Sequence, residues 1–189
     1  MKQYDPEKAP IAAVGRTLLA RVAEGDRRAM DDFYRCYQAS VYRFALSLLS
    51  DPFAAADVLN EVMLQVWKSG RHYLGEANPV TWLLGIAHHV AMNHLRGRYR
   101  HAAEPLDESM PDPDRPEPAQ LVAAFQDRAR VRNCIDKLSE KHRAAIHLAF
   151  YEELAYAEIA TALDCPEGTV KTRVFHAKEM LRRCLGAIA

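Results

Sequence analysis

The stretch CPEGTVKTRVFHAKEMLRRC, Cys165–Cys184, carries the most specific pattern in the chain. At 3.6 residues per turn, four apolar side chains fall within about 60° of one another. They are Val170, Val174, Ala177 and Leu181. Asp164 or Cys165 can precede the first turn, and Pro166 suits the first helical position. The opposite arc holds Lys171, Thr172, Phe175, His176, Glu179, Arg182 and Arg183. The pattern predicts a helix that turns an aromatic ring and several cations away from the core.

A shorter helical pattern, YAEIATAL (Tyr156–Leu163), stands just before it, with Ile159, Ala160 and Leu163 facing inward. A short helix, a tight turn and a longer helix form the helix-turn-helix pattern, whose second helix enters the major groove of DNA. Cations neutralise phosphates, threonine and histidine can bond base edges, and phenylalanine can contact a thymine methyl. The alternative is a helical hairpin with a solvated polar face.

Composition limits the classes of protein to consider. The chain has 189 residues, about half of them apolar, and a formal net charge of zero. This length fits one domain or two small ones. No apolar run approaches the roughly eighteen residues of a membrane span. The first residues, MKQYDPEKAPIAAVG, lack the apolar core of a signal peptide. We therefore expect a cytoplasmic protein without membrane insertion of its own. The four cysteines are far apart and form no CxxC pair, so reduced thiols are expected.

The charges are segregated along the chain. Between Glu104 and Glu117 there are six acidic residues against Arg115 alone, and five of the ten prolines lie between Pro105 and Pro118. Such a segment cannot stay helical or bury apolar area. Residues 102–118 are predicted to be a flexible, acidic linker between domains at 1–101 and 119–189. No period-two alternation predicts a strand, so the fold class expected is all-α, as two small helical domains.

Four helices are predicted in the N-terminal domain. Their approximate ranges are Ile11–Glu24, 27–49 starting after Asp26, Pro52–Ser69 starting after Asp51 as its cap, and Pro79–Arg98. The second buries a stripe of Met30, Phe33, Tyr37, Val41, Phe44 and Leu48. The third buries Val58, Leu59, Val62, Met63 and Val66, and leaves Leu64 among polar residues on its outer arc. A lone exposed leucine is ordinary, although an apolar anchor with a polar rim has the same appearance.

The fourth helix turns a mixed stripe outward. Leu83, Ile86, Ala87, Val90 and Ala91 face inward, whereas Trp82, His89, Met92, Asn93, Arg96 and Arg100 lie on the far side. Rings stack on bases, amides read base edges and guanidinium groups hold phosphates, so the stripe suits unpaired nucleic acid. The alternative is a solvated basic face with Trp82 packed against a neighbouring helix, which we favour for Trp82 itself.

These residues resemble the extracytoplasmic-function (ECF) group of bacterial RNA polymerase sigma factors, which keep only sigma regions 2 and 4. Four stretches carry the resemblance, from about Leu18 to Leu185. They are EGDRRAMDDFYRCYQASVYRFAL, DPFAAADVLNEVMLQVWKS, NPVTWLLGIAHHVAMNHLRGR and KLSEKHRAAIHLAFYEELAYAEIATALDCPEGTVKTRVFHAKEMLRR. The resemblance implies an alternative sigma factor for a stress or environmental response, held inactive by an anti-sigma factor.

The resemblance also implies roles for individual residues. On the third helix, the residues expected to dock on the clamp coiled coil of the largest subunit of core polymerase are Asp57, Asn60, Glu61, Leu64 and Trp67. The loop from Arg71 to Asn78 and the fourth helix, with His89, Asn93, Arg96 and Arg100, would bind the separated strands of the promoter −10 element. The −35 element would be read by Lys171, Thr172, Phe175 and His176, with Arg173 and Arg182 nearer phosphates.

Three positions depart from the family pattern. Asn60 stands where glutamine is usual, Asn93 where aspartate is frequent, and His176 where arginine is usual. The last change bears on −35 specificity, because arginine grips guanine with two hydrogen bonds and histidine cannot.

Catalysis is not expected, since neither a phosphate-binding glycine loop nor a nucleophile motif is found in the sequence. No cofactor is expected either. His88, His89 and His94 lie on three sides of one helix and cannot converge on a metal ion, so no metal site is predicted. Two alternatives remain open at this point. One is a two-domain transcriptional repressor or activator that binds duplex DNA alone, and the other is a helical adaptor without DNA function.

Overall fold

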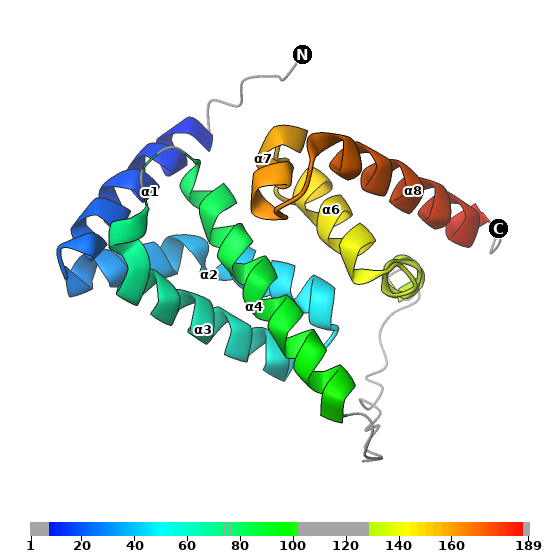
Figure 1. The fold of residues 1–189 in the computed structure, drawn as a ribbon, viewed down its shortest axis with the longest axis horizontal. Coiled ribbons are helices and arrows are strands. Elements are labelled where there is room, and N and C mark those ends of the chain that lie inside the picture. The colour runs from blue at the N-terminus through cyan, green and yellow to red at the C-terminus, as the bar shows by residue number, and fades with distance from the viewer. Residues whose placement is uncertain (1–7, 74, 76, 102–128, 187–189) are drawn as a thin grey trace, which may run out of the picture.

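The computed structural model describes residues 8–73, 75, 77–101 and 129–186, with the side chains of 8–11 and 99–101 outside that description. The helices are α1 (Lys8–Ala23), α2 (Arg27–Leu49), α3 (Pro52–Ser69), the 3-10 turn η1 (Gly70–His72), α4 (Pro79–His101), α6 (Glu140–Phe150), α7 (Tyr156–Ala162) and α8 (Glu167–Gly186) (Figure 1). Residues 129–136 are also helical. Within the described ranges the fold is helical without a strand, which confirms the all-α prediction. The predicted linker, residues 102–118, lies outside the described residues.

Aspartates cap two of the long helices where the sequence predicted it. The Asp26 carboxylate accepts hydrogen bonds from the backbone N–H groups of Arg28 and Ala29, at 2.9 and 3.1 Å. Asp51 does the same for the first turn of α3, in which Pro52 fills the first helical position. These caps satisfy N–H groups that the helix itself cannot pair.

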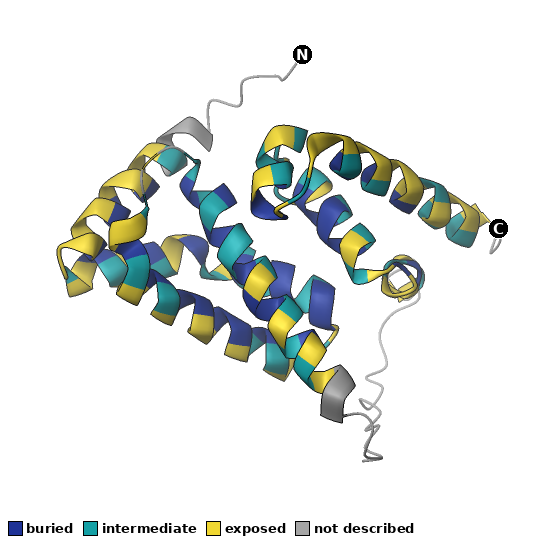
Figure 2. Ribbon diagram, in the orientation of Figure 1, coloured by how far each residue is buried: buried dark blue, intermediate teal, exposed yellow. Residues whose placement is uncertain are grey.

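Helices α1 to α4 form the N-terminal bundle, whose interior takes one apolar stripe from each helix (Figure 2). The stripes predicted on α2, α3 and α4 are buried, except that Met30 and Ile86 are only partly buried. Gly15 of α1 marks a close approach to α2 and α4. A Cβ atom there would overlap the hydroxyl of Tyr37 and lie 3.1 Å from the side chain of Pro79. Tyr37 is 2% exposed.

The C-terminal bundle consists of residues 129–136 and helices α6, α7 and α8. Glu158 of α7 accepts a hydrogen bond from the backbone N–H of Ala155 at 2.8 Å, which fixes the start of that helix. The turn between α7 and α8 contains Asp164 in the left-handed region, at φ 45°. Val170, Val174 and Ala177 of α8 are buried, whereas Leu181, the fourth residue of the predicted stripe, is only partly buried. The predicted helix-turn-helix is therefore present.

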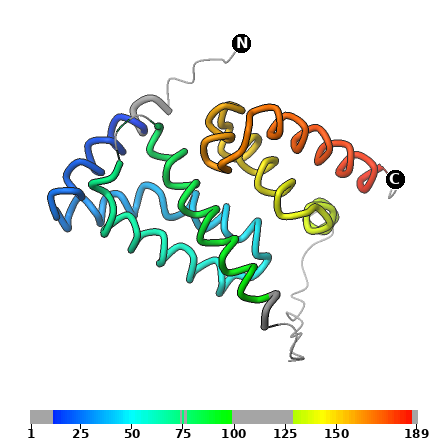
Figure 3. Tube along the Cα trace, in the orientation of Figure 1, coloured from blue at the N-terminus to red at the C-terminus, as the bar shows by residue number. Residues whose placement is uncertain are grey.

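The two bundles pack against each other, α6 on α2 and α7 on α4 (Figures 1 and 3). The rings of Phe44 and His147 lie 5.3 Å apart across this contact. A Cβ atom at Gly85 would lie 3.5 Å from the carbonyl oxygen of Ala162, so α4 and α7 are in van der Waals contact. Buried residues of both bundles belong to one continuous cluster. The sequence did not predict how the bundles are arranged.

Polar groups rim the contact between the bundles. The Ser50 hydroxyl donates to the Asp136 carboxylate at 3.0 Å and accepts from Arg143 at 3.1 Å. Burial raises the pKa of Glu152, but hydrogen bonds with His147 and Ser40 outweigh it, and the pKa is lowered overall. The carboxylate is therefore held ionised at this edge.

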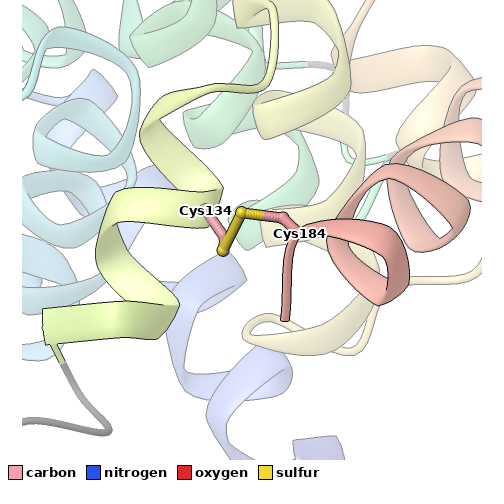
Figure 4. The surroundings of a disulfide bond; sticks show 2 residues. All are labelled: Cys134 and Cys184. Carbon is pink, nitrogen blue, oxygen red and sulfur yellow. A yellow bond between two sulfur atoms is a disulfide. The ribbon is translucent and has the colours of Figure 1, made fainter. Parts of the chain in front are cut away.

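A disulfide joins Cys134 to Cys184, which corrects the expectation of reduced thiols for this pair (Figure 4). The two Cα atoms are 5.8 Å apart although 50 residues separate them in sequence. Separation along the chain was a poor guide, because the fold places the helix at 129–136 beside the end of α8. Cys36 and Cys165 are free thiols. A search of the described helices found none that is both long and apolar enough to cross a bilayer.

We expect Gly15→Ala to destabilise the N-terminal bundle by roughly 1–3 kcal/mol, because the added methyl overpacks a site already filled by Tyr37. Urea unfolding of the full chain measures the effect. The control is Gly97→Ala in α4, where a Cβ atom meets open space and a gain of up to about 1 kcal/mol is expected. Equal effects of the two substitutions would contradict the described packing of α1.

Cys184→Ser is expected to lower the free energy of unfolding by up to about 4 kcal/mol, the loop entropy removed by a cross-link of this span. Cys36→Ser, at an exposed free thiol, is the control and should leave stability unchanged. Peptide mapping under non-reducing conditions should recover Cys134 and Cys184 in one linked pair. If both thiols are alkylated without reductant, the disulfide is absent.

Candidate nucleic-acid interface

The outer face of α3 gathers all five residues that the sequence analysis assigned to core-polymerase docking. Asp57, Asn60, Glu61, Leu64 and Trp67 are all exposed. Leu64 is 50% exposed and Trp67 is 36% exposed. They share one face because the opposite stripe of α3 is buried against α2 and α4. An apolar centre with acidic and amide neighbours can accept a helix that carries basic residues beside an apolar stripe.

Neighbouring side chains orient Glu61 on this face. One carboxylate oxygen accepts a hydrogen bond from Gln65 at 3.3 Å, and the other lies 3.3 Å from Nε2 of His94 on α4. This contact places His94 on the side of α4 that adjoins α3. His89 is exposed elsewhere on α4, and His88 faces the C-terminal bundle. Among the residues that the structure describes, no three His, Cys, Asp or Glu side chains are placed to share a metal ion.

The stripe predicted on α4 is partly assembled. His89, Asn93 and Arg96 are exposed. The Arg96 guanidinium donates to the Asn93 side-chain oxygen at 2.8 Å and to the Met92 carbonyl at 3.3 Å. The cation and the amide are therefore held together along one edge, as phosphate and base contacts would require. The side chain of Arg100 lies outside the described residues.

The loop before α4 is held against the helix by its aromatic residue. The rings of Tyr73 and Trp82 are 5.2 Å apart, and the Tyr73 hydroxyl donates to the carbonyl of Ala77. Trp82 is thus half-buried, as favoured from the sequence, but the ring that it meets belongs to the loop and not to a neighbouring helix. Beside this loop lies a cavity of about 220 Å³, lined in part by Arg16, Arg71 and Tyr73. Sequence reasoning missed Arg16, because nothing in the pattern of α1 indicated that it reaches the loop.

The outer face of α8 presents the predicted reading residues. Lys171, Thr172, Phe175, His176 and Arg182 are exposed, and Phe175 is 62% exposed. The ring of His176 meets that of Phe175 edge-on at 5.6 Å. This open face lies opposite the buried stripe of Val170, Val174 and Ala177, so the apolar ring is presented to solvent by the geometry of the helix.

Intrahelical contacts hold several of these side chains. Lys171 pairs with Glu167 at 2.8 Å, and the hydrogen bond to that carboxylate raises the pKa of the lysine. The Thr172 hydroxyl donates to the carbonyl of Gly168 at 2.9 Å, so its oxygen can still accept a hydrogen bond from a partner. Arg182 pairs with Glu179 at 3.0 Å.

Arg173 is the member of the predicted set that the structure does not bring to this face. It is half-buried, and its guanidinium lies 3.5 Å from the sulfur of Cys165. It also faces His88 of the other bundle. Burial and the charge of Arg173 lower the pKa of His88. Burial and the nearby His176 and Arg173 likewise lower the pKa of His142. Both histidines are therefore biased toward the neutral form beside a fixed cation.

Phe53 is a second residue that the sequence analysis did not name. It is 86% exposed in the first turn of α3. Its angular position, 20° from Leu64 at 100° per residue, was the signal that could have found it.

Known protein families match both bundles. Residues 33–101 match the model of sigma-70 region 2, and residues 128–181 match sigma-70 region 4. The RNA polymerase sigma-H factor of Pseudomonas aeruginosa is 33% identical over 179 residues, which cover 89% of this chain and 92% of that protein. The ECF RNA polymerase sigma factor SigK of Mycolicibacterium vanbaalenii is 34% identical over 179 residues, covering 89% of this chain and 88% of the relative.

Solved structures share the fold. The sigma factor RpoE of Bartonella quintana, in complex with the anti-sigma factor NepR, matches with a TM-score of 0.67 and 21% identity, over 82% of this chain and 96% of that one. CnrH, in complex with the cytosolic domain of CnrY, matches with a TM-score of 0.69 and 22% identity, over 93% and 99% of the two chains. With region 2 and region 4 both matched and relatives aligned over most of their length, the chain belongs to the ECF group of RNA polymerase sigma factors.

Proposed function

We propose that this chain directs core RNA polymerase to a set of promoters, with residues 1–101 as region 2, 102–118 as linker and 119–189 as region 4. The observation that carries the proposal is the exposure of Phe175 among Lys171, Thr172 and His176 on α8. A solvent-exposed ring rimmed by cations and hydroxyls suits a major groove, where it can contact a thymine methyl between phosphate contacts. Membership of the sigma family disfavours the repressor or activator alternative.

Each of the other surfaces takes one step of initiation. The outer face of α3, centred on Leu64 and Trp67, docks on the clamp coiled coil of the largest polymerase subunit. The α4 stripe of His89, Asn93 and Arg96, continued by Arg100 and by the loop from Arg71, holds the −10 element as its strands separate. Unpaired bases can stack and bond there at about 1–3 kcal/mol each. The chemistry of RNA synthesis belongs to the polymerase, so this chain is not itself an enzyme.

Binding both elements requires the bundles to separate. The −35 and −10 elements are about 25 base pairs apart by their names, or roughly 85 Å of duplex at 3.4 Å per base pair. A compact chain of this length has a radius of gyration of about 16 Å. The arrangement in which α7 packs on α4 is therefore that of the protein when it is not bound to a promoter. In that state Arg173 is half-buried and close enough to His88 for its charge to lower the pKa of the histidine, and separation would free Arg173 for phosphate.

Regulation is expected to act on the same surfaces. The solved relatives are bound to NepR and to the cytosolic domain of CnrY, the first of which is an anti-sigma factor. We propose that an anti-sigma factor restrains this chain also, that release follows a stress or environmental signal, and that the chain acts in the cytoplasm.

Phe175→Ala tests whether the exposed ring on α8 contributes to promoter recognition. Promoter-specific initiation by the reconstituted holoenzyme should fall by about tenfold, because a base contact is worth roughly 1–3 kcal/mol, while affinity for core polymerase stays unchanged. Met180→Ala is the matched control, since Met180 is an exposed apolar side chain on another side of the same helix. Initiation by the Phe175 variant at the level of the Met180 variant would argue against a reading role for α8.

Replacing both His89 and Asn93 by alanine tests the −10 role. Strand opening at the promoter, followed by permanganate reactivity of unpaired thymines, should decrease while duplex binding upstream persists. Thr17→Ala, at an exposed polar residue of α1, serves as the control for a substitution elsewhere on the surface of the N-terminal bundle. If the double variant opens the promoter strands as well as the unaltered chain does, α4 has no role in strand opening.

A further inference from the structure

The strongest unexplained feature of the surface is Phe53. At 86% exposure it is the most exposed large apolar side chain in the described part of the chain, ahead of Tyr151 at 69% and Phe175 at 62%. A scattered apolar residue on a surface is common and needs no explanation. A nearly fully solvated phenylalanine on a rigid element is a different case, because its whole ring is available to a partner.

The backbone beneath Phe53 is fixed. Its N–H donates to the Asp51 carboxylate at 2.9 Å, and the N–H of Ala54 donates to the same carboxylate at 3.1 Å. Asp51 also lies 3.7 Å from Arg98 of α4. Ala55, two residues further on, is fully buried. The ring therefore projects from a capped first turn, and little backbone entropy would be lost when a partner covers it.

Phe53 continues the outer face of α3 rather than standing apart from it. At 100° per residue it lies 20° from Leu64 and 40° from both Asp57 and Trp67. Phe53 at one end and Leu64 with Trp67 at the other thus mark a face about 21 Å long, at 1.5 Å per residue over fourteen residues, with Asp57 and Asn60 exposed between them. Asp57 and Glu61 add two exposed carboxylates to the same arc. We call this set the α3 ridge.

We propose that Phe53 is the N-terminal anchor by which the α3 ridge docks on a helix of core polymerase, and that this helix carries an apolar stripe flanked by arginine or lysine. The inference rests on the proposed function, since it extends the docking surface, which begins at Asp57, by about one helical turn toward the start of α3. A face of this length with an apolar anchor at each end fits a partner helix of several turns, and the carboxylates between the anchors call for basic residues beside the partner's apolar stripe.

A second copy of this chain is the less suitable occupant. Antiparallel pairing of two α3 ridges centres on Asn60, midway between Phe53 and Trp67, so the Glu61 side chains of the two copies would lie only about 3 Å apart along the helix axis. Like charges brought together at an interface are unfavourable. Charge therefore favours a basic partner over self-association.

The test measures the dissociation constant of the full chain for core polymerase. Phe53→Ala should raise it by about tenfold, as expected for loss of a buried aromatic anchor. Phe53→Leu, which keeps an apolar side chain, should lose less. Val14→Ala removes an exposed apolar side chain from α1 and should have no effect. Circular dichroism and thermal unfolding of each variant check that the fold is unchanged, as expected for a solvated residue.

Leu64→Arg separates failure of the inference from failure of the proposed function. Weakened binding by Leu64→Arg with Phe53→Ala within twofold of the unaltered chain would overturn the anchor and leave the docking surface in place. Unchanged binding by both variants would overturn the docking surface as well. If Phe53→Ala instead abolishes self-association seen by sedimentation, without a change in affinity for core polymerase, the occupant is a second copy and the inference is wrong.

Discussion

One continuous apolar core joins the two bundles, and the surfaces of the protein follow from it. Phe44 of α2 meets the ring of His147 in α6, while Gly85 of α4 lies against Ala162 of α7. Each helix buries an apolar stripe in this core. The side chains on the opposite face of the helix are therefore exposed to solvent. The exposure of Leu64, Asn93 and Phe175 is therefore a consequence of packing geometry. We infer function from the chemical types of the side chains on these exposed faces.

The packing of the two bundles covers part of one candidate functional surface and leaves the others exposed. The contact of α7 with α4 covers part of the helix-turn-helix and brings Arg173 toward His88, yet the outer faces of α3, α4 and α8 stay open. An arrangement that half-buries Arg173 while Phe175 and Arg182 stay exposed suits a factor that gains promoter affinity only on the polymerase. Two weak DNA contacts become one strong interaction when a common scaffold sets their separation.

Periodicity was enough to predict the helices and their buried faces, because one apolar stripe per helix is a local property. Asp26 and Asp51 marked helix starts, and Val58, Val62 and Val66 marked an inner face that is buried. Contacts between distant segments could not be predicted this way. The Cys134–Cys184 disulfide, the pairing of Glu61 with His94 and the burial of Arg173 depend on how helices pack, which no local pattern encodes. The helical angle of Phe53 places it on the outer face of α3, but the residues around it in the sequence did not mark it as part of a binding surface.

The central claim is that the chain selects promoters only as part of the polymerase. Transcription of a genomic fragment library by core enzyme, with and without the chain, tests it most directly when duplex retention by the chain alone is measured on the same fragments. The account predicts discrete start sites that require both components, and no fragment retained selectively by the chain alone. Selective, tight duplex binding without polymerase, or no new start sites with it, would contradict the account.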